Sequence, residues 1–259
     1  MDFFTTEALS AFLTLTFLEI VLGIDNILFI TLIANKLEVK DRTRATQIGL
    51  VLAMLLRIFL LMGISIFIGM QESWFVIDTA LLHTEVSGQS LILFIGGLFL
   101  IYKATKEIYE RVEEPNHSIE TLQSGKLSLS KAVLQITLIN IVFSFDSILT
   151  AIGMTNGLPN AFWLMVIAVI VSVLIMMLFA NPVGNFVSKH PSLQVLGMAF
   201  LLLIGFMLVT EAAHLSHTKF MNEAIGSIPK GYLYFAIAFS LGVEFINMKM
   251  RTRKSKNPA

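Results

Sequence analysis

Long apolar runs, separated by short polar connections, dominate the chain. A helix that spans a bilayer needs about 20 mostly apolar residues, and seven windows of the sequence meet this condition. The runs are continuous and lack the period-two alternation of barrel strands, so the pattern predicts an all-α integral membrane protein with seven transmembrane helices. The predicted helices cover residues 8–34, 48–70, 90–110, 132–154, 161–181, 193–214 and 231–248.

The basic residues fall mainly on alternate connections, which predicts the orientation. Lys and Arg occur in the first, third and fifth connections and in the C-terminal tail, whereas the second and fourth connections carry none. Lys219 and Lys230 in the sixth connection are an exception. Because positive residues concentrate in cytoplasmic loops, we expect the N-terminus outside and the C-terminus in the cytoplasm.

A polar motif occurs twice inside the apolar windows. Aligned without gaps, residues 18–28 and 139–149 pair Glu19 with Asn140, Gly23 with Ser144, Asp25 with Asp146 and Asn26 with Ser147. A carboxylate inside a membrane costs about 2.5–3.5 kcal/mol on insertion scales, and such residues usually serve a function. Two of them in matching contexts therefore indicate a duplicated polar site.

The positions of the two motifs, in the first and fourth predicted helices, indicate an internal repeat. Residues 8–110 and 132–217 form two three-helix units, and 231–248 adds a seventh helix to a single transmembrane domain over residues 1–259. Since three is odd, the second unit is inverted in the membrane relative to the first. Inverted repeats are common in transporters, whose substrate sites lie near the midplane where the repeats meet.

The chemistry of the motif indicates its ligand. Carboxylates, amides and hydroxyls are hard oxygen donors, which suit Mg²⁺, Ca²⁺ or Mn²⁺. The candidate metal ligands are Asp25, Asp146, Glu19, Asn26, Ser147, Asn140 and Glu244. The alternative is a structural polar network, or carboxylates that are protonated in the membrane.

Other charged residues inside the windows need partners. Arg57 is either a counter-ion for Glu19, Asp25 or Asp146, or it reaches towards the cytoplasmic surface. Lys103 and Glu107, four residues apart, are expected to form an interfacial ion pair.

Two further acidic residues lie in the sixth and seventh windows. Glu244 lies in an apolar run and must face protein or water. Glu211, His214 and His217 have the spacing of metal ligands on a helix, but the favoured interpretation is polar residues at a helix exit.

Composition narrows the classes of partner. The chain is 56% hydrophobic and 14% charged, where a soluble domain has about 25% charged residues. Its 18 basic and 18 acidic residues cancel, so no nucleic-acid partner is expected. The absence of Cys excludes disulfides and thiolate metal sites. No Lys or Arg precedes the first apolar run, so a cleavable signal peptide is not expected.

The residues of these motifs also resemble a known family. Residues 19–27, 96–108, 143–148, 204–211 and 243–247 resemble the TerC family of integral membrane proteins, within the LysE-type transporter superfamily. The resemblance covers nearly the whole chain and is to short members without soluble regulatory domains. It implies a seven-helix inverted-repeat fold, a bacterial cytoplasmic (inner) membrane location and efflux of Mn²⁺. Asn140 is a departure, because many relatives carry an acid at that position.

The leading hypothesis is therefore a transporter that exports Mn²⁺ or a similar divalent cation through a midplane carboxylate site, with proton exchange left open. Its partners would be the metal ion and the bilayer, with a homo-oligomer also left open. We expect no enzymatic activity and no bound cofactor. A membrane factor that supplies metal to exported proteins is the main alternative. An intramembrane aspartyl protease, which also needs two membrane Asp residues, is less favoured because its flanking motifs are absent.

Overall fold

The computed structural model describes residues 6–63, 69–79, 81–113, 128–155, 158 and 160–256. For residues 22, 24, 25, 28, 111, 146 and 251–256 it describes the backbone only. The side chains of Asp25 and Asp146 therefore lie outside what the structure describes.

Helices of 24 to 29 residues make up most of the described chain. They are α1 (Thr6–Ala34), α2 (Val39–Met62), α4 (Gly88–Val112), α6 (Leu129–Thr155), α7 (Ala161–Ser188), α8 (Pro191–Leu215) and α9 (Lys230–Lys256). Within the described residues, five segments are long and apolar enough to cross a membrane: Val39–Met62, Leu129–Thr155, Ala161–Ser188, Pro191–Leu215 and Lys230–Met250. The protein is thus a mostly helical membrane protein.

The second predicted helix is displaced along the sequence. We expected it over residues 48–70, but α2 begins at Val39 and ends at Met62. The predicted window contains only the apolar part of the helix. It therefore omits the first turns of α2, which carry the charged Lys40 and Arg42. The helix stops where Gly63, a poor helix former, follows it and donates its N–H to the carbonyl of Phe59 at 3.1 Å.

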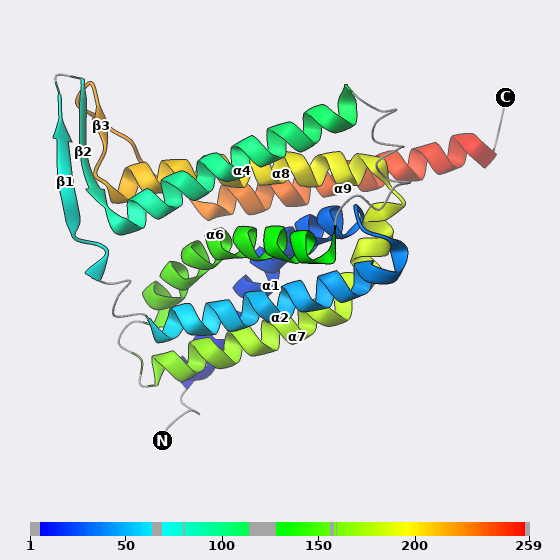
Figure 1. The fold of residues 1–259 in the computed structure, drawn as a ribbon, viewed down its shortest axis with the longest axis horizontal. Coiled ribbons are helices and arrows are strands. Elements are labelled where there is room, and N and C mark those ends of the chain that lie inside the picture. The colour runs from blue at the N-terminus through cyan, green and yellow to red at the C-terminus, as the bar shows by residue number, and fades with distance from the viewer. Residues whose placement is uncertain are drawn as a thin grey trace.

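A small antiparallel sheet departs from the all-α prediction. It consists of β1 (Ser73–Asp78), β2 (Leu82–Ser87), β3 (Lys219–Phe220) and β4 (Glu223–Ala224), in that order. The α2–α4 and α8–α9 connections therefore meet, and Thr84 and Thr218 join them through their hydroxyls at 2.8 Å. Figure 1 shows this sheet projecting at one end of the helices.

The start of α4 shows how the sheet leads into the helices. Ser87 ends β2 and caps α4, because its hydroxyl accepts from the Ser90 N–H at 3.2 Å. The Ser90 hydroxyl in turn accepts from the Ser87 N–H at 3.0 Å. This reciprocal capping box satisfies two of the donors that a helix start leaves open. The chain can therefore turn from strand to helix within one residue.

The opposite end of the helices is held together by polar contacts between connections. Lys36, after α1, lies 2.5 Å from Glu107 on α4, and Lys103 lies 3.0 Å from the same carboxylate. The predicted Lys103–Glu107 pair is thus confirmed and gains a third member. Ser188 at the end of α7 donates to Asn35 at 3.0 Å. The α1–α2 and α7–α8 connections therefore lie together at the end away from the sheet (Figure 1).

The helices pack in three close pairs, which are α4 with α8, α1 with α7, and α2 with α6. At the α4–α8 crossing, Gly97 and Gly205 lie back to back. A Cβ added to Gly97 would lie 2.7 Å from the carbonyl oxygen of Gly205, and the reverse contact would be 2.9 Å. The absence of side chains at both positions lets the two backbones approach closely. These pairs place the polar motifs of α1 and α6 inside the bundle.

Candidate functional site

Arg57 forms a buried ion pair at the centre of the polar site. Its side chain projects from α2, is 2% exposed as a residue, and donates through Nη1 to Oε2 of Glu19 on α1. Its Nε also donates to the Ser144 hydroxyl on α6 at 3.3 Å. Of the two interpretations of Arg57, the counter-ion is therefore the one observed. The guanidinium thus links α1, α2 and α6 inside the bundle.

The polar residues of the second motif bond mainly within α6. Asn140 donates to the Ile136 carbonyl at 2.8 Å, and Ser144 donates to the Asn140 carbonyl at 2.5 Å. Ser147 donates to the Ser144 carbonyl at 3.2 Å. All three side chains are buried. Since the hydroxyl protons go to the helix backbone, the hydroxyl oxygens remain available as acceptors, and Ser144 uses its oxygen for Arg57.

Gly23 and Ser144, which the motif alignment pairs, have different neighbours. Ser144 contacts Arg57, whereas Gly23 faces Met176 on α7, whose sulfur lies so near that a Cβ on Gly23 would be 2.0 Å away. Met176 thus approaches the first motif as Arg57 approaches the second. The motif alignment sets the charged Glu19, which Arg57 pairs, against the neutral Asn140.

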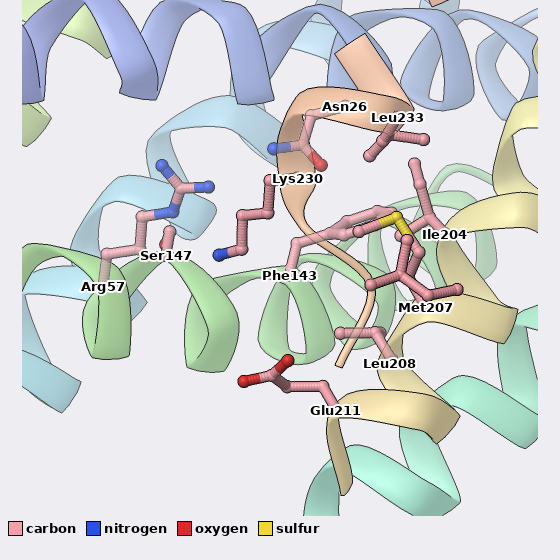
Figure 2. A pocket seen from close by; sticks show the side chains of 11 residues that line it. Asn26, Arg57, Phe143, Ser147, Ile204, Met207, Leu208, Glu211, Lys230 and Leu233 are labelled. Atoms are coloured by element: carbon pink, nitrogen blue, oxygen red, sulfur yellow. The ribbon is translucent and has the colours of Figure 1, made fainter. Parts of the chain in front are cut away.

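A cavity of about 40 Å³ opens beside this network. Its polar lining comes from Asn26, Arg57, Ser147, Glu211 and Lys230, on five different helices, and Phe143, Met207 and Leu233 belong to its apolar lining (Figure 2). A water needs about 10–15 Å³ by this kind of measure. The cavity could therefore hold about three waters, or an ion with part of its hydration shell.

A second cavity of about 10 Å³ also borders Arg57. Glu19, Arg57 and Ser147 line it together with apolar residues of α1, α2, α6 and α7. Arg57 and Ser147 therefore line both cavities.

Glu211 and Lys230 are cavity residues that the sequence analysis did not assign to the site. Glu211 was interpreted as a polar residue at a helix exit, yet its side chain lines the cavity. Lys230 was counted as a charge in a connection, yet it begins α9 and donates to the Thr150 hydroxyl at 2.6 Å. In Figure 2 both charged groups extend into the space below Asn26. The available signal was that Glu211 ends a long apolar run.

The histidines that follow Glu211 take no part in the cavity. His214 is exposed, and Nδ1 of His217 lies 3.5 Å from Glu85 on β2. A helical triad of Glu211, His214 and His217 is therefore not formed.

Two candidate ligands carry buried oxygens without a hydrogen-bond partner in the described part of the chain. Oδ1 of Asn26 is one, and Asn26 lines the larger cavity. Oε1 of Glu244 is the other, and its Oε2 accepts from Asn247 at 3.5 Å. Glu244 lines neither cavity, so the structure does not bring it to the predicted site.

The remaining predicted ligands are placed by backbone alone. Positions 25 and 146 immediately precede Asn26 and Ser147, which both line the larger cavity. Among the side chains that the structure describes, no three His, Asp or Glu residues form a group able to hold a metal ion. A metal site built on Asp25 and Asp146 stays a prediction.

One protein family and several curated proteins match nearly the whole chain. The family described as "Integral membrane protein TerC family" matches residues 4–258. A UPF0053 protein of Haemophilus influenzae is 43% identical over 249 residues, which are 95% of this chain and 95% of that protein. The UPF0053 inner membrane protein YgdQ of Escherichia coli is 41% identical over 245 residues, covering 95% of this chain and 93% of YgdQ.

A longer relative shares the same segment. The UPF0053 inner membrane protein YoaE of Escherichia coli is 40% identical over 239 residues, which are 92% of this chain and 42% of YoaE. No solved structure is similar enough to count as a match. The relatives from Escherichia coli are named inner membrane proteins, and the apolar helices here fit that location. The chain is a multi-pass protein of the bacterial inner membrane and belongs to the TerC family of integral membrane proteins.

Proposed function

We propose that this protein transports a divalent metal cation, with Mn²⁺ export as its physiological activity. One observation carries the proposal, which is the cavity lined by Asn26, Ser147 and Glu211 next to the backbone of positions 25 and 146. Oxygen donors of this kind suit hard divalent cations. Ionisable residues inside a membrane, such as Glu211 here, also commonly mark the path of a transported ion.

The helix pairing supports a three-plus-three inverted repeat as the transport framework. The proposed repeat matches α1 with α6, α2 with α7 and α4 with α8. When each helix is replaced by its match, the α1–α7 pair becomes the α6–α2 pair, and the α4–α8 pair is unchanged. All three close pairs obey this exchange. The Gly97–Gly205 contact would then lie on the axis that relates the halves. Seven membrane crossings with the N-terminus outside would place the β-sheet on the outer surface.

Transport would follow from rocking of one unit against the other around the cavity. Asp25 and Asp146 would be the principal metal ligands, with Asn26 and Ser147 as neutral oxygen donors. Arg57 holds Glu19 in an ion pair, so Glu19 would organise the site and not bind the metal directly. The same carboxylates could carry protons in the opposite direction.

Uptake of Mn²⁺ by sealed vesicles that contain the purified protein tests the proposal. We expect uptake by the parent protein and its loss in Asp25→Asn and Asp146→Asn. Lys219→Gln, an exposed change on β3, serves as the control and should transport normally.

Two results would favour other functions. No Mn²⁺ uptake by the parent, despite Mn²⁺ binding, would favour supply of metal to exported proteins. Cleavage of a membrane-helix reporter that is lost in Asp25→Ala would favour the intramembrane protease.

A further inference from the structure

The cavity contains a lysine whose charge has the same sign as the proposed cargo. Lys230 lines the space together with Glu211, Asn26 and Ser147 (Figure 2). Its ammonium crosses from the start of α9 to the Thr150 hydroxyl on α6, at 2.6 Å. Thr150 lies one helical turn after Asp146, the aspartate of the second copy of the motif. A metal ion and this ammonium would repel each other strongly in so small a space.

The start of α9 adds to this positive potential. The first turn of a helix carries unpaired N–H groups and the positive end of the helix dipole, and Lys230 is the first residue of α9. Against this, the buried Oδ1 of Asn26 lines the same cavity and has no hydrogen-bond partner in the described part of the chain. The cavity wall thus presents an oxygen ready for a cation together with the ammonium of Lys230.

Lys230 follows an irregular segment of the chain. Residues 225–229 precede it without regular secondary structure and end in Pro229. A lysine is a compact ammonium on a flexible stem, whereas Arg57 is fixed by bonds to both Glu19 and Ser144. Of the two cavity cations, Lys230 is therefore the one that can be displaced without breaking the buried ion pair.

We propose that Lys230 is a built-in competitor of the transported divalent cation: its ammonium occupies the cavity when no metal is bound, and metal binding displaces it together with residues 225–229. This role rests on the proposed function. In the metal-free protein, the ammonium of Lys230 would neutralise the acidic groups of the site. The empty site could then switch from one side of the membrane to the other without cargo. Glu211 would be shared between the ammonium and the metal in turn.

Binding of Mn²⁺ to the purified protein tests the competition directly. Lys230→Gln should bind Mn²⁺ about tenfold more tightly than the parent, since it removes one competing charge, a change of roughly 1.4 kcal/mol. Lys230→Arg keeps the charge and should not tighten binding. Lys219→Gln in the same connection is the matched control and should bind as the parent does.

The results separate this role from the proposed function. If the parent binds Mn²⁺ and Lys230→Gln binds it equally or more weakly, Lys230 is not a competitor, although transport can still be correct. If the parent binds no Mn²⁺, both proposals are wrong.

Displacement of the segment can be measured without changing Lys230. The chain contains no cysteine, so Ser227→Cys introduces a single reactive thiol into residues 225–229. We expect Mn²⁺ to raise its labelling rate by a water-soluble maleimide severalfold, and to leave unchanged the labelling of Ser73→Cys on β1. An unchanged rate for Ser227→Cys at saturating Mn²⁺ would overturn the displacement.

Discussion

The guanidinium of Arg57 and the carboxylate of Glu19 form an ion pair inside the helix bundle, and both residues are less than 5% exposed. Removing one member of a buried pair leaves an uncompensated charge, which costs about 3–5 kcal/mol. Replacing both by neutral residues that pack well can be nearly neutral. The motif alignment places the neutral Asn140 opposite Glu19, and α7 places the apolar Met176 against Gly23 of the first motif.

This comparison predicts the outcome of exchanging the pair. Arg57→Met and Glu19→Asn should each destabilise the protein by about 3–5 kcal/mol, because each leaves a buried charge unpaired. The double variant removes both charges and should recover most of that loss. Thermal unfolding in detergent measures all three. Additive losses in the double variant would mean that the two charges stabilise the fold independently.

The α4–α8 crossing predicts a strong effect of a small substitution. Gly97→Ala places a methyl 2.7 Å from the backbone of Gly205, so the helices must separate. We expect a loss of about 1–3 kcal/mol, as for other overpacked sites. Gly242→Ala on α9, where nothing lies within 4 Å, should be neutral or slightly stabilising in the same unfolding measurement. Equal effects at both positions would contradict the close backbone contact.

The ion cluster at the end away from the sheet predicts a second stability effect. Glu107 contacts Lys36 at 2.5 Å and Lys103 at 3.0 Å, and its side chain is 16% exposed. Glu107→Gln would leave two ammonium groups facing each other and should cost about 1–3 kcal/mol. Glu110→Gln removes a more exposed acid that lies 3.8 Å from Lys106, and should cost less than about 1 kcal/mol. A similar loss in the two variants would show that the cluster contributes no more than a surface pair.

Much of the helical framework could be predicted from the sequence, because lipid requires long apolar helices whose backbone groups bond internally. The sheet could not be predicted in the same way. All six residues of β1 are exposed, so the strand lacks the alternation by which a half-buried strand is recognised. The displaced start of α2 has a related cause, since its first turns are charged and hydropathy does not count them.

The residues of the site could be predicted where neighbouring residues in the sequence indicate them, but not where distant helices bring them together. The motif identified Asn26 and Ser147, and the apolar window of the second helix identified the charge of Arg57. Three acids were open as its partners, and the structure shows the pair with Glu19. Lys230 reaches its position because α9 begins beside α6, 80 residues away along the chain. No spacing rule within one helix could have indicated that contact.

Glu211 provides the sharpest test of whether the cavity is the transport site. It is a described carboxylate in the lining of the larger cavity, so Glu211→Gln should weaken Mn²⁺ binding about 10- to 100-fold, as expected when a charged ligand worth about 1.5–3 kcal/mol is removed. Glu223→Gln is the matched control, because Glu223 is exposed on β4. Mn²⁺ titration of both variants in detergent measures the difference. If Glu211→Gln binds as the control does, Glu211 is not a metal ligand, and the larger cavity is not the metal path.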